Sequence, residues 1–221
     1  MTTTAAVASS SSSSSAAASV TEQLIGLEAA HGAHNYAPLP VVLNKGRGVH
    51  VWDVEGKQYL DFLSAYSAVN QGHSHPKILA ALTEQAQRLT LTSRAFHNDA
   101  LGEYAAFVTA LFGYDRVLPM NTGVEGGETA VKLARRWGYD GKGIPEGHAT
   151  VLFAAGNFWG RTLGAISSST DPSSRKGFGP FVPGFECVPY DDLAALEERL
   201  ATGAGGAEVC AFMVEPIQGE A

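Results

Sequence analysis

From residue 117 to residue 215 the sequence alternates short apolar runs with amphipathic helical patterns. The runs 149–155 (ATVLFAA) and 209–215 (VCAFMVE) are apolar at almost every position, which is typical of strands covered by helices on both faces. This alternation predicts an α/β fold with a largely parallel sheet, whose ligands bind beyond the carboxyl ends of the strands. The predicted order is the apolar run 117–121 (VLPMN), a helix near 124–137, the run 149–155, a helix near 159–166, a short strand around Cys187 and Val188, a helix at 191–200 and the run 209–215.

The rest of the chain predicts a less regular organisation. Residues 2–19 contain only Thr, Ala, Val and Ser, so we expect a disordered tail over residues 1–22. Residues 23–75 are expected to form an N-terminal segment with a small sheet, because apolar and polar residues alternate around a turn at Glu55-Gly56. The α/β body is expected over 76–221, beginning with two amphipathic helices, one from Pro76 and one from Asn98 or Asp99.

Composition excludes several functions. The net charge is −7, from 15 Lys and Arg against 22 Asp and Glu, without a basic cluster for nucleic acid. No stretch approaches the roughly 18 apolar residues of a membrane span. The two cysteines lack CxxC spacing and are expected in the core, so neither a disulfide nor a metal site is predicted. We expect a cytoplasmic protein. The mitochondrial matrix is the alternative, because the N-terminal segment is rich in Ser, Ala and Thr and has no acidic residue before Glu22, as in a transit peptide. Against this alternative, a transit peptide needs early positive charge, and the first basic residue is Lys45.

The run 117–121 is followed by a helix start that suits an anion. Thr122 and Glu125 have the spacing of a capping box, which places Gly123 at the first helical position. Free backbone N–H groups and the helix dipole at such a start bind phosphate. The alternative is a glycine-rich turn that only begins a helix. The buried face of this helix is predicted to be Ala130, Leu133, Ala134 and Trp137.

Two further strand ends carry candidate residues. Phe158, Trp159 and Arg161 follow the run 149–155; an exposed ring could stack on a planar ligand and the arginine could bind a carboxylate. The alternative, which spacing alone does not separate, is a core aromatic pair with a solvated arginine. Glu215 and Glu220 follow the last run, where a carboxylate either pairs with a cation or takes part in proton transfer.

Other motifs fail on inspection. The segment 72–76 (GHSHP) has Pro where a nucleophile elbow has its second Gly, so a serine hydrolase is a weak alternative. The pairs His73/His75 and His31/His34 lack further ligands at a fitting spacing, and no metal is predicted.

Four segments, 34–78, 121–139, 157–169 and 213–221, together resemble the class III, ornithine-type pyridoxal-phosphate aminotransferases of fold type I. The resemblance covers the chain from about Ile25 to its end. It implies the cofactor pyridoxal 5'-phosphate, a homodimer when full length, and transfer of the δ-amino group of ornithine to 2-oxoglutarate, giving glutamate 5-semialdehyde and glutamate. Tyr36, within HNYAPLP, favours ornithine over acetylornithine; another ω-aminotransferase, acting on acetylornithine or 4-aminobutyrate, remains the alternative.

The resemblance also implies roles for individual residues. For the cofactor, the Gly123 and Val124 amides would hold the phosphate, Phe158 would stack on the pyridine ring and Glu215 would lie beside it. For the substrate, Arg161 would bind the α-carboxylate, Tyr36 and Tyr66 would line the ornithine pocket, and Glu220 would screen a second arginine. The sequence departs from the family at Gly126, where an alanine is expected, and at Ala37, where a larger residue is expected.

Family members bind the cofactor through a Schiff-base lysine that lies downstream of the segment 215–220. None of the six lysines of this chain lies in that context, so no catalytic residue is assigned. We therefore expect an N-terminal fragment with part of a small domain and the first half of a large domain, inactive alone. A non-catalytic, naturally truncated product is the alternative.

Overall fold

The computed structural model describes residues 18–202 and 206–219. Residue contacts divide the chain between Asn98 and Asp99 into two units, and each is described by itself. The sequence prediction began the second unit at residue 76, whereas the helix that starts at Pro76 belongs to the first unit. An amphipathic pattern shows that a helix has an apolar face, but not which unit that face belongs to.

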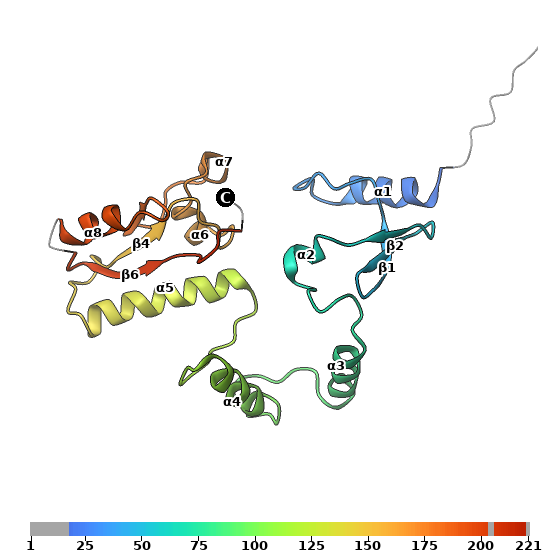
Figure 1. Cartoon of the computed structure of the whole chain (residues 1–221), viewed down its shortest axis with the longest axis horizontal. Coiled ribbons are helices and arrows are strands. Elements are labelled where there is room, and N and C mark those ends of the chain that lie inside the picture. Colours follow the sequence, from blue (N-terminus) through green and yellow to red (C-terminus); the bar gives the residue numbers. More distant parts are fainter. Residues whose placement is uncertain (1–17, 203–205, 220–221) are drawn as a thin grey trace, which may run out of the picture. The chain divides into compact units, whose positions relative to one another are not determined.

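The first unit combines helices with a small antiparallel sheet of order β1-β2-β3 (Figure 1). Its elements are α1 (Val20–His31), β1 (Leu43–Arg47), β2 (His50–Asp53), β3 (Gln58–Leu60), α2 (Ser64–Ser67) and α3 (Pro76–Arg88). The predicted turn at Glu55-Gly56 connects β2 to β3. The Asp53 carboxylate closes this turn, because it accepts hydrogen bonds from the N–H groups of Glu55 and Lys57 at 3.0 and 2.8 Å and from the Tyr59 hydroxyl at 2.7 Å.

Helix α1 begins inside the region predicted as a tail. Ser19 caps the helix: its hydroxyl accepts from the N–H of Glu22 at 3.2 Å, and the Glu22 carboxylate accepts from the N–H of Ser19 at 2.8 Å. Such a capping box satisfies two N–H groups that a helix start leaves without partners. The Ser-x-x-Glu spacing was present in the sequence, so the tail prediction to residue 22 was too long by at least three residues.

The second unit contains the predicted parallel sheet, with strand order β5-β4-β6. Figure 1 shows α5 and α8 on opposite faces of this sheet. The central strand β4 is buried at all five positions, and the core around it contains Val131, Ile144, Val151, Phe153 and Cys210. The elements are α4 (Leu101–Phe112), α5 (Gly123–Asp140), β4 (Thr150–Ala154), α6 (Leu163–Ser167), α7 (Pro172–Arg175), β5 (Phe185–Val188), α8 (Leu193–Ala201) and β6 (Val209–Met213).

Several expectations for this unit were wrong. Cys187, which was expected in the core, is exposed, whereas Cys210 is buried as predicted. The helix predicted near 159–166 begins only at Leu163. The run 117–121 forms no strand, since neither sheet of the described residues pairs with it.

The buried face of α5 also differs from the prediction: Val131 and Gly138 are buried, whereas Leu133 and Trp137 are 69% and 55% exposed. Of the predicted residues, Ala134 does pack against the core.

Glycines explain this difference in α5. A Cβ atom on Gly138 would lie 2.8 Å from Cβ of Cys210 in β6, and one on Gly127 would lie 2.6 Å from the indole ring of Trp159. The helix therefore approaches the sheet through positions that have no side chain. Hydrophobic periodicity counts side chains, so it selected the neighbouring apolar face instead.

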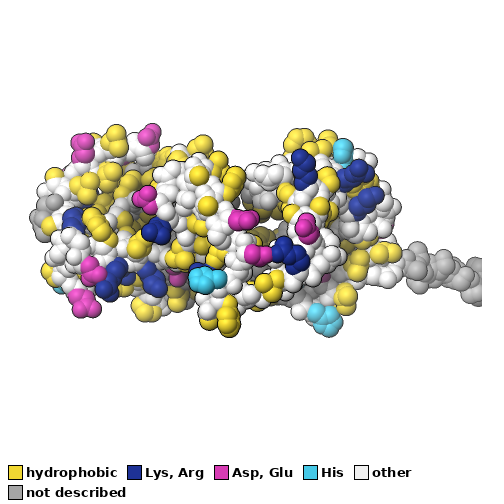
Figure 2. Space-filling view, turned by 90° about the horizontal axis from the view of Figure 1, so that it is seen from below, with side chains coloured by type: hydrophobic (Ala, Val, Ile, Leu, Met, Phe, Trp, Pro, Cys, Tyr) yellow, Lys and Arg dark blue, Asp and Glu magenta, His cyan; other side chains and the backbone are white. Residues whose placement is uncertain are grey.

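Large apolar side chains are exposed on both units, and Figure 2 shows many of them on the visible face. Helices α3 and α4 bury no residue completely, although Leu82 and Phe107 carry apolar side chains that are 63% and 66% exposed. Within the described residues, no helix is long and apolar enough to cross a membrane.

Candidate functional site

The loop after β4 separates its two aromatic residues. The Trp159 ring stacks on Phe153 of the core, with centroids 5.9 Å apart, and its indole N–H donates to the Ser168 hydroxyl at 2.8 Å. Asn157 supports this arrangement by donating to the carbonyls of Ala154 and Ser168 at 2.8 and 2.9 Å. Phe158, in contrast, is 42% exposed. The sequence analysis left open whether these aromatic residues lie in the core or face a ligand. The structure gives a different answer for each: Trp159 packs on the core, and Phe158 faces outward.

The loop after β6 lies against the loop after β4. Glu215 accepts a hydrogen bond from the backbone N–H of Phe158 at 3.2 Å, and the Gln218 amide donates to the carbonyl of Ala155 at 2.6 Å. Gly156 has φ +75°, and a Cβ atom there would lie 3.1 Å from Oε1 of Gln218. These contacts hold the backbone of the loop after β4, including that of Phe158, against the loop after β6.

The start of α5 has the predicted capping box. The Thr122 hydroxyl accepts from the N–H of Glu125 at 3.2 Å, and the Glu125 carboxylate accepts from the N–H of Thr122 at 3.0 Å. The first helical residues, Gly123 and Val124, have no intrahelical acceptor for their N–H groups. Nothing lies within 4 Å of the position that a Cβ atom on Gly123 would take. This helix start is therefore open to an anion.

The loop after β4 also packs on this helix start. Gly160 has φ +147°, and a Cβ atom there would lie 2.3 Å from Cγ2 of Val124. The Thr162 hydroxyl donates to the Glu128 carboxylate at 2.5 Å. Glycine is required at position 160 both by its backbone conformation and by the close approach of Val124.

Arg161 lies on the same loop. Its guanidinium carbon is 5.9 Å from the centroid of the Phe158 ring, and the side chain is exposed. The second unit thus brings together five of the sequence-predicted residues at the carboxyl ends of β4 and β6: Gly123, Val124, Phe158, Arg161 and Glu215. The backbone N–H groups could bind a phosphate, the aromatic ring could stack on a planar ligand, and the arginine could bind the carboxylate of a second molecule.

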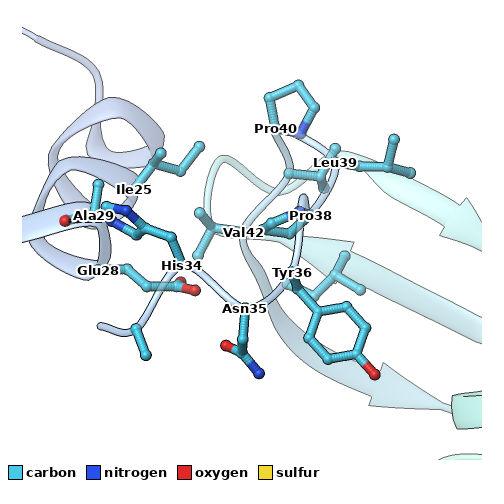
Figure 3. Close-up of a pocket in the computed structure, with 13 residues that line it drawn as sticks. Ile25, Glu28, Ala29, His34, Asn35, Tyr36, Pro38, Leu39, Pro40 and Val42 are labelled. Atoms are coloured by element: carbon cyan, nitrogen blue, oxygen red, sulfur yellow. Dashed lines mark hydrogen bonds between the residues drawn. The ribbon is translucent and has the colours of Figure 1, made fainter. Parts of the chain in front are cut away.

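The remaining predicted residues lie elsewhere. Tyr36 and Tyr66 belong to the first unit and are 60% and 70% exposed, and Glu220 lies outside the described residues. Tyr36 lines a cavity of about 480 Å³ between α1 and residues 33–43. In Figure 3 its ring projects away from Ala29 of α1.

Tyr66 lies in an unusual backbone segment that the sequence analysis did not identify. The four residues of the short element α2, Ser64–Ser67, include no glycine and have φ between 49° and 69°, so α2 is a left-handed turn and not a regular α-helix. This left-handed conformation costs about 1–2 kcal/mol per residue in a chain of L-amino acids. Such strain persists only where surrounding contacts hold it.

Asp61 and His73 lie next to this segment and were also missed as a pair. His73 Nε2 is 2.6 Å from Asp61 Oδ2. The hydrogen bond from His73, together with backbone N–H bonds, lowers the pKa of Asp61 below its ordinary value. His73 was considered above only as a possible metal ligand; among the residues that the structure describes, no group of three or more metal-binding side chains occurs.

Comparisons with known sequences identify relatives of the chain. The sequence model of the family Aminotransferase class-III matches residues 31–221. The mitochondrial ornithine aminotransferase of Drosophila ananassae is 67% identical over 202 residues, which are 91% of this chain and 46% of that protein. The chain therefore spans about half the length of the curated relatives it matches.

Solved structures give the same relationship. An ornithine aminotransferase structure from Toxoplasma gondii, described as having partial occupancy of PLP at its active site, matches with a TM-score of 0.86 and 51% identity over 90% of this chain and 46% of that one. The acetylornithine aminotransferase of Elizabethkingia anophelis matches with a TM-score of 0.76 and 54% identity over 90% of this chain and 45% of that one. Because the family model matches residues 31–221, which are most of the sequence, the chain belongs to the class III aminotransferases.

Proposed function

We propose that this chain is the N-terminal part of a pyridoxal-phosphate-dependent aminotransferase that moves the δ-amino group of ornithine to 2-oxoglutarate, giving glutamate 5-semialdehyde and glutamate. The observation that carries the proposal is the grouping of the α5 start, Phe158 and Arg161 on one edge of the sheet. The identity of 67% to an ornithine aminotransferase supports the choice of substrate.

The residues present fit the cofactor. The N–H groups of Gly123 and Val124 would bind its phosphate, because nothing fills the space beside Gly123 and the helix dipole favours an anion there. Phe158 would cover one face of the pyridine ring. Glu215 would keep Phe158 in place through the 3.2 Å hydrogen bond to its backbone. When bound, pyridoxal phosphate supplies an electron sink for breaking bonds at the amino carbon.

The substrate residues follow from the same proposal. Arg161 would bind the α-carboxylate of the amino acid in a bidentate pair. Tyr36 and Tyr66 would line the pocket for the ornithine side chain, and Glu220 would screen a second arginine. Arginine suits a planar carboxylate better than lysine does, because its guanidinium presents two parallel N–H donors.

We further propose that the chain has no transaminase activity alone. A Schiff-base lysine is required, and none of the six lysines follows the segment 215–220. Among the described lysines, Lys142 has a structural role: its ammonium donates to the carbonyl of Val209 at 2.7 Å, at the beginning of β6. The exposed apolar faces of α3 and α4 support completion by further protein, and we propose that the complete enzyme is a homodimer.

A chimeric enzyme tests the function. In it, this chain replaces the 202 aligned residues of the Drosophila ananassae relative, whose remaining half is kept. We expect the purified chimera with pyridoxal phosphate to convert ornithine and 2-oxoglutarate, and residues 1–221 alone to give no turnover. A chimera that prefers acetylornithine or 4-aminobutyrate would identify a different ω-aminotransferase. A folded chimera without activity toward any of these donors would favour the non-catalytic product.

We propose a cytoplasmic location, with the mitochondrial matrix as the alternative that the Drosophila ananassae relative's name supports. Fractionation of cells that express the chain with a C-terminal tag decides between them. Recovery in the matrix with a shortened N-terminus would overturn the cytoplasmic assignment.

A further inference from the structure

The Asp61 side chain binds the backbone at the start of the left-handed turn Ser64–Ser67. Its Oδ1 accepts hydrogen bonds from the backbone N–H groups of Leu63 and Ser64 at 3.0 and 2.9 Å. The N–H of Asp61 itself donates to the carbonyl of Val49 at 2.9 Å. One carboxylate thus sets the direction in which the chain leaves the small sheet and enters the turn.

His73 connects the Asp61 carboxylate to the same sheet through hydrogen bonds. Its ring donates through Nε2 to Oδ2 of Asp61 at 2.6 Å, and its backbone N–H and carbonyl both pair with Gly48 at 2.9 Å, in the turn between β1 and β2. A Cβ atom on Gly46 of β1 would lie 2.7 Å from Cγ of His73. The imidazole therefore rests directly on the backbone of β1 and has little freedom to move.

The turn that this pair holds carries Tyr66. Ser64 and Tyr66 have φ of 49° and 54°, and the Tyr66 side chain is 70% exposed. A strained turn relaxes unless its surroundings hold it, and the direction of an exposed side chain depends on the backbone that carries it. We propose that Asp61 and His73 are positioning residues that hold the turn Ser64–Ser67, so that Tyr66 is presented to the amino-acid substrate. This inference rests on the proposed function, which places Tyr66 in the ornithine pocket.

The ionised form of Asp61 fits this role. Its pKa is lowered, first by the hydrogen bond from His73 and then by the backbone N–H of Ser64, so the carboxylate remains an acceptor at neutral pH. Asp53 is a matched comparison in the same sheet. It also accepts from two backbone N–H groups and one side chain, but these three hydrogen bonds close the β2–β3 turn and come from Glu55, Lys57 and Tyr59.

The first experiment measures the turn in the 221-residue chain by NMR. The amide-to-α coupling and the intraresidue NOE of Ala65 and Tyr66 report positive φ. We expect Asp61→Asn and His73→Phe to lose these signals, His73→Gln to keep them partly because its amide still donates, and Asp53→Asn to leave them unchanged. Positive φ at Tyr66 in both Asp61→Asn and His73→Phe would overturn the inference.

The second experiment measures ornithine kinetics in the chimeric holoenzyme described above. Asp61→Asn removes hydrogen bonds to a charged carboxylate, so a smaller fraction of the molecules has the turn Ser64–Ser67 in the conformation that binds substrate. The apparent affinity for ornithine falls by the same factor as this fraction. We expect KM for ornithine to rise about tenfold in Asp61→Asn, with kcat changing less than about twofold, and Asp53→Asn to match the parent. KM for 2-oxoglutarate should rise less, because its chain carries no δ-amino group for the tyrosine pocket.

The outcomes separate the inference from the proposed function. A turn that opens by NMR while KM for ornithine stays constant overturns the positioning role, although an active parent chimera still supports the function. A parent chimera without transaminase activity refutes the function and, with it, the link to substrate. An opened turn with raised KM, and partial recovery of both in His73→Gln relative to His73→Phe, supports the inference.

Discussion

Helix α5 packs on the sheet through Gly138, so a larger residue at this position should destabilise the fold. In Gly138→Ala, the new Cβ atom would lie 2.8 Å from Cβ of Cys210 and 3.1 Å from Cδ1 of Ile144. The first of these neighbours is fixed to the backbone of β6, so the helix itself must shift. Overpacking of this kind costs about 1–3 kcal/mol.

Gly126→Ala in the same helix is the matched control, because nothing lies within 4 Å of its new Cβ atom. Both substitutions gain about 0.5–1 kcal/mol from replacing glycine by alanine in a helix. This gain cancels when the two variants are compared. We therefore expect Gly126→Ala to be slightly more stable than the parent, and Gly138→Ala to be about 1–3 kcal/mol less stable than Gly126→Ala.

Urea unfolding followed by far-UV circular dichroism measures this difference. For a chain of this size, 1 kcal/mol corresponds to roughly 2–4 °C in Tm, so thermal unfolding provides a second measurement. Equal stability of the two variants would refute the packing of α5 on Cys210 through Gly138.

Three further predictions concern charged residues. Arg199 of α8 donates to the carboxylates of Glu186 in β5 at 2.6 Å and of Glu208, just before β6, at 3.0 Å. Arg199→Met should therefore lower the free energy of unfolding in urea by about 1.5–3 kcal/mol, and no loss would show that these ion pairs do not stabilise the fold. Hydrogen bonds, first from the hydroxyl of Ser173, lower the pKa of Asp171 to about 2, so its stabilisation is complete above the unfolded pKa near 4 and is lost as pH falls toward 2. The stability gap between the parent and Asp171→Asn should therefore be constant from pH 5 to 7 and close at lower pH, and a gap that grows on acidification would contradict this sign. In the chimera, Arg161→Lys should raise KM for both amino acid and oxo acid about tenfold or more, measured by steady-state kinetics, because the bidentate carboxylate contact is lost; an unchanged KM would remove Arg161 from substrate binding.

Local signals in the sequence were sufficient where the chemistry itself is local. The capping box of Thr122 and Glu125 fixed the start of α5, because both partners lie within one helical turn. The apolar runs predicted β4 and β6, since a strand with apolar residues on both faces must be covered on both faces. The sequence also indicated that Phe158 and Glu215 each follow a strand, and the structure shows that these strands are neighbours and that the two residues are hydrogen-bonded.

What remained undecided in the sequence depended on contacts between distant segments. The sequence by itself determined the class of fold, the position of the helix start at Gly123 and the residues that follow the strands, because these follow from periodicity and spacing. Only the tertiary structure decided which aromatic residue is buried, which face of α5 meets the sheet, and that Asp61 and His73 hold the turn of Tyr66. The physical reason is that glycine contacts and the Asp61–His73 pair join positions up to dozens of residues apart, and a one-dimensional pattern contains no record of which of them meet.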